Sequence, residues 1–287
     1  MLRRKSRRQR PRGRAVSNMT NVQKEPVASK AMDDKLREIW GKFENKGWIL
    51  RALRDSLPPT RVTSMGVKFI VHPRDNFTEF RIWEMGRPPE FEATEKIAGM
   101  LEGQDAVIVD VGANAGAFGL PILARAGKKA RAVMFEPNPV MLNRLQTNVA
   151  LNDFDNVEIF DCAVSDAEGR SAMFFPSNGN LGQGRVELSY GDEPRDEAAQ
   201  VAIRPLADCL KEAGVKGVDF LKVDVEGLED KVICPLLEAG KAVWPKMIYF
   251  EVEHQNAWGL PLLERLDSCG YVEIESFGKN RLFRRGE

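Results

Sequence analysis

Apolar and polar positions follow two alternating patterns along residues 106–287. Short apolar runs, typical of strands buried on both faces, are separated by stretches in which apolar residues recur with a helical period. The strands predicted in this way are 106–111, 131–137, 157–164, 201–205, 219–227, 247–253, 271–278 and 281–285, with a hairpin-like segment at 171–176. The predicted helices are 117–126, 140–151, 208–213, one that ends at 237, and 261–268. This alternation predicts an α/β fold with a mainly parallel sheet and helices on both faces.

The last two predicted strands are joined only by a short turn at Lys279 and Asn280. Parallel neighbours need a long crossover connection, so we expect the final strand to be antiparallel.

The part of the chain before residue 106 has a different pattern. It is predicted to hold a helical stretch, two segments that alternate like a hairpin, and a second helix, at 32–57, 67–72, 79–83 and 90–101 respectively. We therefore expect residues 32–105 to form a helix and hairpin cap on one core domain, residues 106–287.

Charge separates the first residues from the rest of the chain. Residues 1–14 carry eight Arg or Lys and no acid, which leaves 34 basic and 42 acidic side chains, a net charge of −8, in the remainder. Residues 1–31 contain almost no large apolar side chains and cannot offset the entropy lost on ordering, so we expect a flexible basic tail there. The acidic body gives no reason to expect a nucleic-acid partner.

Four cysteines are scattered without C-x-x-C spacing, which argues against a zinc site and against a disulfide framework. The basic N-terminal segment is not followed by the apolar run of a signal peptide, and no segment approaches the roughly 20 apolar residues of a membrane span. These features favour a cytoplasmic protein.

The most informative motif is VIVDVGANAG, residues 107–116. A buried strand ends in an acid, and spaced glycines then permit a tight turn in which the backbone approaches a ligand closely. The spacing of Gly112, Gly116 and Gly119 differs from the G-x-G-x-x-G of dinucleotide sites, and no G-K-[ST] is present. The remaining interpretation is the D-x-G-x-x-x-G turn of enzymes that use S-adenosylmethionine (SAM).

Ligands of open parallel sheets bind at the carboxyl ends of the strands. The first such end carries Asp110 and the turn of Gly112, Asn114 and Gly116, which we expect to meet the amino-acid end of the cofactor. Asn114 stands where many methyltransferases have a glycine, and asparagine tolerates a left-handed backbone. The second strand ends at Glu136, which is expected to accept hydrogen bonds from the ribose hydroxyls.

Three residues follow the third strand, Asp161, Cys162 and Ala163, where backbone or side chain is expected to contact the adenine ring.

The segment DFLKVDVEG brings charged residues into a strand pattern. Lys222, Asp224 and Glu226 should project to one face, which is tolerable only at the open end of the sheet. A purely structural ion pair between Lys222 and Asp224 is the alternative. The next strand ends YFEVEH, which should bring Glu251 and His254 to the neighbouring rim.

These strings together resemble the FkbM family of methyltransferases: DVGANAG, FEPNP, CAVSDAEG, FLKVDVEGLE and FEVEH. The resemblance runs from about residue 90 to residue 271. It implies a Rossmann-like class I methyltransferase fold, with a seven-stranded, mainly parallel sheet and an antiparallel last strand. It also implies SAM-dependent methylation of a hydroxyl on a sugar, glycolipid or natural-product acceptor. The cofactor contacts that it suggests are Asp110, Gly112, Asn114, Gly116 and Glu136, and the acceptor-facing residues are Asp224, Glu226 and Glu251.

In such a transfer a base that removes the hydroxyl proton would add about 10² to 10⁴-fold to the rate. Asp224 is the first candidate and His254 the second. Clustered acids also suit a hard cation such as Mg²⁺, but the sequence defines no ligand geometry and we assign no metal site. Nothing in the sequence bears on the oligomeric state.

Two other functions deserve comparison. A NAD-dependent oxidoreductase is favoured by the acid at Glu136 but opposed by the glycine spacing and by the lack of a Y-x-x-x-K motif. A nucleic-acid methyltransferase is suggested by the basic tail, but the chain has neither N-P-P-[YF] nor a Pro-Cys pair.

Overall fold

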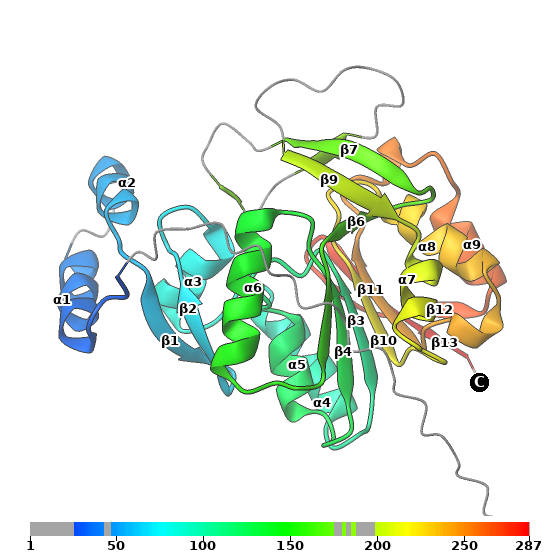
Figure 1. The fold of residues 1–287 in the computed structure, drawn as a ribbon, viewed down its shortest axis with the longest axis horizontal. Coiled ribbons are helices and arrows are strands. Elements are labelled where there is room, and N and C mark those ends of the chain that lie inside the picture. Colours follow the sequence, from blue (N-terminus) through cyan, green and yellow to red (C-terminus); the bar gives the residue numbers. More distant parts are fainter. Residues whose placement is uncertain (1–25, 43–46, 175–179, 182–184, 188–198, 287) are drawn as a thin grey trace, which may run out of the picture.

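The computed structural model describes residues 26–42, 47–174, 180–181, 185–187 and 199–286 (Figure 1). Its centre is a seven-stranded sheet in the order β12-β13-β11-β10-β3-β4-β5. These strands are β3 (Val107–Val111), β4 (Arg131–Phe135), β5 (Val157–Phe160), β10 (Phe220–Val223), β11 (Met247–Glu251), β12 (Tyr271–Phe277) and β13 (Asn280–Arg285). Strand β13 is antiparallel to both β11 and β12, whereas β5, β4, β3, β10 and β11 pair in parallel. The predicted Rossmann-like methyltransferase fold is confirmed, including its antiparallel last strand.

Helices cover both faces of this sheet (Figure 1). On one side lie α4 (Phe91–Leu101), α5 (Gly119–Arg125) and α6 (Pro139–Leu151). On the other lie α7 (Leu206–Glu212), α8 (Glu229–Glu238) and α9 (Leu262–Ser268), with short 3-10 turns at η2 (Lys241–Val243) and η3 (Gln255–Ala257). Ile108 packs into the first hydrophobic cluster, and its neighbours Val109 and Val111 pack into the second. This alternation explains why the sheet strands are apolar throughout.

A second, smaller sheet differs from the sequence prediction. Residues 157–164 were expected to form one strand, but the segment divides at Asp161, and the part after it joins a four-stranded sheet in the order β6-β9-β7-β8. Its strands are β6 (Cys162–Val164), β7 (Gly169–Phe174), β8 (Arg185–Glu187) and β9 (Ala199–Arg204). The apolar pattern runs through both strands, so only the tertiary pairing of β6 with β9 reveals the break.

The segment before residue 106 also required a correction. It contains α1 (Lys30–Gly41), α2 (Gly47–Asp55), β1 (Thr60–Ser64), β2 (Val67–Val71) and α3 (Phe77–Met85). A hairpin exists, but β2 pairs with β1, and the expected second strand at 79–83 is part of helix α3. Asn76 caps that helix by accepting the N–H of Glu79, and Gly86 ends it with a left-handed backbone, which is why a helix forms there.

The expected flexible tail lies largely outside the described residues, because residues 1–25 are not described. Helix α1 begins at Lys30, with Ser29 as its cap, slightly before the predicted boundary at residue 31. All four cysteines are free. Among the described residues no helix is both long and apolar enough to cross a membrane.

Candidate active site

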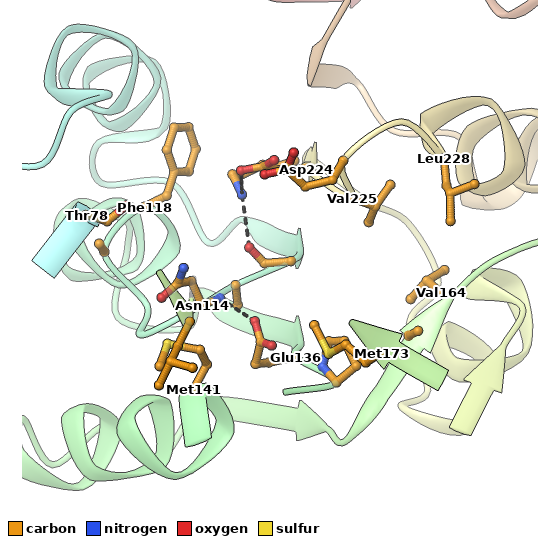
Figure 2. Close-up of a pocket in the computed structure, with 18 of the residues that line it drawn as sticks. Thr78, Asn114, Phe118, Glu136, Met141, Val164, Met173, Asp224, Val225 and Leu228 are labelled. Atoms are coloured by element: carbon orange, nitrogen blue, oxygen red, sulfur yellow. Dashed lines mark hydrogen bonds and ion pairs between the residues drawn. The ribbon is translucent and has the colours of Figure 1, made fainter. Parts of the chain in front are cut away.

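A cleft opens at the carboxyl ends of β3, β4 and β10 and encloses about 1020 Å³ of empty space, part of it continuous with solvent. Glu136, Met141 and Met173 lie on one side of it, with Asp224 and Val225 opposite (Figure 2). Six residues predicted from the sequence line it: Gly112, Asn114, Glu136, Ala163, Asp224 and Glu226. The second sheet closes the cleft through Met173 and Ile203.

The first glycine of the motif is required by a close backbone contact. Gly112 has φ +78°, and a Cβ there would lie 2.0 Å from the carbonyl oxygen of Asp224. The loops after β3 and β10 therefore touch through bare backbone. Gly116, φ +86°, does not line the cleft; a Cβ there would meet the side chains of Leu120 and Leu145, so its role is packing of the turn.

Asn114 and Glu136 form one hydrogen-bonded unit at the floor of the cleft. The backbone N–H of Asn114, φ +52°, donates to Glu136 Oε2 at 2.7 Å, and Asn138 N–H donates to Glu136 Oε1 at 2.8 Å. The Asn114 side chain accepts from Asn76 Nδ2 at 2.9 Å, which ties the turn to the cap. Burial raises the pKa of Glu136 to about 7 despite the two N–H donors that lower it.

A buried lysine connects the two strand ends. Strand pairing places Lys222 beside Asp110 on one neighbour and beside Tyr249 on the other. Lys222 Nζ donates to Gly112 O at 3.1 Å and to Asp224 Oδ2 at 3.2 Å, and lies 3.6 Å from Asp110 Oδ1. Burial would lower the pKa of Lys222, but the charges of Asp224, Asp110 and Glu90 outweigh it and raise that pKa above its ordinary value.

The ion pair between Lys222 and Asp224 that the sequence left as an alternative is therefore present. Asp110 is fully buried, and burial raises its pKa although Lys222 opposes the shift. It lies beneath the turn instead of lining the cleft. The strand β10 ends at Val223, so Asp224 and Glu226 belong to the following loop, not to the strand as predicted.

The sequence analysis missed two residues that contribute to this arrangement. Glu229, which is fully buried, accepts the Gly227 N–H at 3.1 Å and the Trp258 Nε1–H at 3.1 Å, and so holds the loop after β10 in place. Glu90, in the linker between α3 and α4, lines the cleft and accepts from Tyr249 Oη at 3.0 Å. Burial raises the pKa of Glu90 to about 7. No local motif marks Glu90, because its partners lie more than a hundred residues later.

The remaining predicted catalytic residues form a cluster at the rim. Ligand atoms of Glu226, Glu251 and His254 all lie within 4.8 Å of one another, and together they could hold a divalent cation. Burial, followed by the charges of Asp224 and Glu226, raises the pKa of Glu251 to about 7. Neither Glu251 nor His254 lines the cofactor-sized cleft.

The three residues after the third strand separate in the structure. Ala163 lines the cleft, whereas Asp161 is exposed and Cys162 is buried away from it. A hydrogen bond with Cys209 and burial raise the pKa of Cys162 above its ordinary value. The geometry therefore supports contact of an adenine ring with Ala163 better than contact with the Cys162 thiol.

The chain is similar in sequence to known methyltransferases. The methyltransferase FkbM domain model matches residues 110–273. The chain is 32% identical over 195 residues to the 2-O-methyltransferase NoeI of Sinorhizobium fredii, which covers 62% of this chain and 77% of that protein. It is 30% identical over 167 residues to the 31-O-demethyl-FK506 methyltransferase FkbM of Streptomyces tacrolimicus, which covers 49% of this chain and 62% of that protein.

Among solved structures, a methyltransferase FkbM from Methylobacillus flagellatus aligns with 88% of this chain and 58% of that chain, at 15% identity and a TM-score of 0.45.

Proposed function

This chain belongs to the FkbM methyltransferase family, and from that premise we propose that it transfers a methyl group from SAM to a hydroxyl of a sugar, glycolipid or other natural-product acceptor. Family membership makes the chain a SAM-dependent methyltransferase and removes the oxidoreductase alternative. The observation that carries the choice of a hydroxyl is the group of carboxylates where the loops after β3 and β10 meet, since a neutral alcohol needs a proton acceptor.

The residues of the cleft suit SAM in charge and shape. Among the described residues that line the cleft, Lys222 is the one cation, against the carboxylates of Glu90, Glu136, Asp224 and Glu226. This excess of negative charge favours a ligand that carries a sulfonium and an ammonium group. Each Glu136 oxygen already accepts one N–H and retains a lone pair for a ribose hydroxyl.

Apolar side chains form the wall between Glu136 and the second sheet, where an adenine ring would bind. The residues that could contact it are Met141, Ala163, Val164, Met173 and Ile203. Asn114, Glu136 and this apolar wall lie on one side of the cleft, and Asp224 and Val225 lie on the other (Figure 2). The side of Asp224 and Val225 is therefore left for the acceptor.

When bound, SAM supplies an electrophilic methyl group on a positively charged sulfur. The protein residues align the acceptor oxygen with that methyl group, and proximity and orientation can contribute roughly 7 to 11 kcal/mol. Asp224 and Glu226 hold hydroxyls of the acceptor from the loop that Glu229 fixes. A nucleic-acid acceptor is disfavoured because phosphates would meet these carboxylates.

Ligand binding gives the first test. We expect SAM and its demethylated product to raise the melting temperature by several degrees, and NAD to leave it unchanged. The absence of a shift with SAM, or a shift with NAD, would contradict the proposal.

Methyl transfer gives the second test. Incubation of the protein and labelled SAM with cell-extract fractions should label a fraction whose counts survive mild base, because methyl ethers resist base whereas methyl esters release methanol. Label that is removed by nuclease or by mild base would overturn transfer to a hydroxyl of a small molecule or glycan.

A further inference from the structure

A second cavity adjoins the active site on the side of the cap. It holds about 970 Å³ of empty space, part of it continuous with solvent, between the end of α3, the α3–α4 linker, the start of α4, the ends of β11 and β12 and the start of β13. Pro88 and Glu90 line both this cavity and the cofactor-sized cleft. Glu90 therefore lies where the two spaces meet.

The second cavity has the chemistry of a site for a hydroxylated ring. Phe91 and Phe277 offer partly exposed aromatic rings, with the Arg87 guanidinium 5.0 Å from the ring centre of Phe91. Glu251 and Asn280 add hydrogen-bonding groups to the same walls. Aromatic faces beside carboxylate and amide groups suit a saccharide, whose ring has apolar faces and a hydroxylated edge.

The carboxyl of Glu90 is held in place by neutral partners. Tyr249 Oη donates to Glu90 Oε1 at 3.0 Å, and Asn280 Nδ2 donates to the same oxygen at 3.3 Å. Both bonds reach Oε1, which leaves Oε2 as the oxygen that a hydroxyl proton can reach. Asp224, by contrast, is already engaged by the Lys222 ammonium, whose Nζ lies 3.2 Å from Asp224 Oδ2.

We propose that the second cavity binds the acceptor as a polyhydroxylated ring and that Glu90 is the base of the methyl transfer. The O–H bond of the acceptor breaks and its proton moves to the Glu90 carboxylate. The oxygen electron pair forms the new bond to the methyl carbon, and the electrons of the carbon–sulfur bond remain on sulfur, which becomes a neutral thioether. Glu90 then releases the proton to solvent through the second cavity. This inference rests on the proposed function.

The pH dependence of Glu90 is set by groups on every element that faces it. Burial raises its pKa to about 7; Lys222 on β10 opposes this shift, and Asp224 after β10 and Asp110 on β3 add to it. The Tyr249 hydroxyl on β11 also lowers the pKa of Glu90. Since the carboxylate is the active form, the rate should fall about tenfold per pH unit below pH 7.

Replacement of the carboxyl by an amide is the direct test. Glu90→Gln keeps an oxygen for Tyr249 but cannot take a proton, so we expect a loss of at least about 100-fold in kcat with the labelled acceptor fraction. The acid limb of the pH profile should disappear, and the Kd of the demethylated cofactor should stay within threefold. Glu102→Gln, an exposed acid just after α4, is the matched control and should behave like wild type.

Several outcomes would overturn the inference. One is that Glu90→Gln retains kcat within threefold of wild type. Another is that the fall in rate below pH 7 persists in Glu90→Gln, or that Asp224→Asn abolishes this fall instead. Phe91→Ala should raise the acceptor concentration for half-maximal rate several-fold, whereas Phe77→Ala, an exposed ring on α3, should not. Equal effects of the two Phe variants would contradict the placement of the acceptor.

A carbon-13 titration of glutamate-labelled protein separates this inference from the proposed function. Of the glutamate carboxyl resonances that titrate near pH 7 in wild type, one should vanish in Glu90→Gln while those of Glu136 and Glu251 remain, whether or not methyl transfer is observed. If wild type labels no fraction, the proposed function fails. If no such resonance belongs to Glu90, this inference fails.

Discussion

At the scale of single residues, Gly112 shows how a backbone contact can define a binding turn. Because its φ is +78° and a Cβ would lie 2.0 Å from the Asp224 carbonyl oxygen, Gly112→Ala must push the ends of β3 and β10 apart. We expect SAM affinity, measured by calorimetry, to fall at least about tenfold, since 1.4 kcal/mol of misalignment is enough.

Gly103→Ala is the matched control for that change. Gly103 also has a left-handed backbone, φ +69°, but a Cβ there meets nothing within 4 Å. It should lose about 1 to 2 kcal/mol of stability in denaturant unfolding and keep its SAM affinity. Equal loss of affinity in the two variants would show that strain, not the contact with Asp224, is the cause.

Glu136 leads to a prediction about pH. Its pKa of about 7 means that the carboxyl is protonated in acid and loses one acceptor for the ribose hydroxyls. Below pH 7 the Glu136 carboxyl is therefore mostly protonated in the protein without ligand. SAM binds the ionised form more tightly, so acid weakens binding. Calorimetry should therefore show that SAM affinity increases between pH 6 and pH 8.

In Glu136→Gln the affinity for SAM should be lower and should not change over this interval. An unchanged pH dependence in the variant would assign the proton to another group.

At the scale of elements, the register of β3, β10 and β11 aligns Asp110, Lys222 and Tyr249 in a row across the sheet. Lys222→Met would leave the buried Asp110 without its cation, and loss of one partner of a buried pair costs about 3–5 kcal/mol. Without Lys222 the folded pKa of Asp110 rises further, so the loss should be larger at pH 8 than at pH 5. Urea unfolding at both pH values measures this.

Lys246→Met is the control for that change, because Lys246 pairs with Asp219 while its own side chain is 71% exposed. It should change the free energy of unfolding by less than about 1 kcal/mol at either pH. A pH-independent loss in Lys222→Met would show that packing, not charge, holds the row together.

Elements with a strong period were predictable, and those that depend on distant partners were not. The apolar runs that became β3 and β10 are buried by helices on both sides, so the local pattern was sufficient. Helix α3 was mistaken for a strand because four alternating positions outweighed its caps at Asn76 and Gly86. Glu90 escaped prediction because its chemistry arises from Tyr249 and Asn280, which only the folded chain brings to it.

At the scale of the whole molecule, the cap and the core share one interior. Phe80 and Trp83 of α3 belong to the same hydrophobic cluster as Ile108 of β3 and Leu120 of α5. We therefore propose that the cap, residues 32–105, and the core, residues 106–287, fold as one unit. A core that lacked the cap would expose this cluster to solvent.

A buried ion pair across this boundary allows the idea to be tested. Arg144 of α6 donates to Glu79 of α3 at 2.5 Å, and the two side chains are 6% and 1% exposed. Arg144→Met would leave the buried Glu79 beside His72 without its arginine partner, and should lower the free energy of unfolding by about 3–5 kcal/mol.

Because cap and core share an interior, the loss in Arg144→Met should appear as one shifted transition in guanidinium, with fluorescence and circular dichroism superimposed. Arg265→Met removes a surface pair with Glu238 and should shift the same transition by less than about 1 kcal/mol. If the cap instead melts first in Arg144→Met, with the circular dichroism of the core retained, then residues 106–287 fold without it and the shared interior does not couple the two parts.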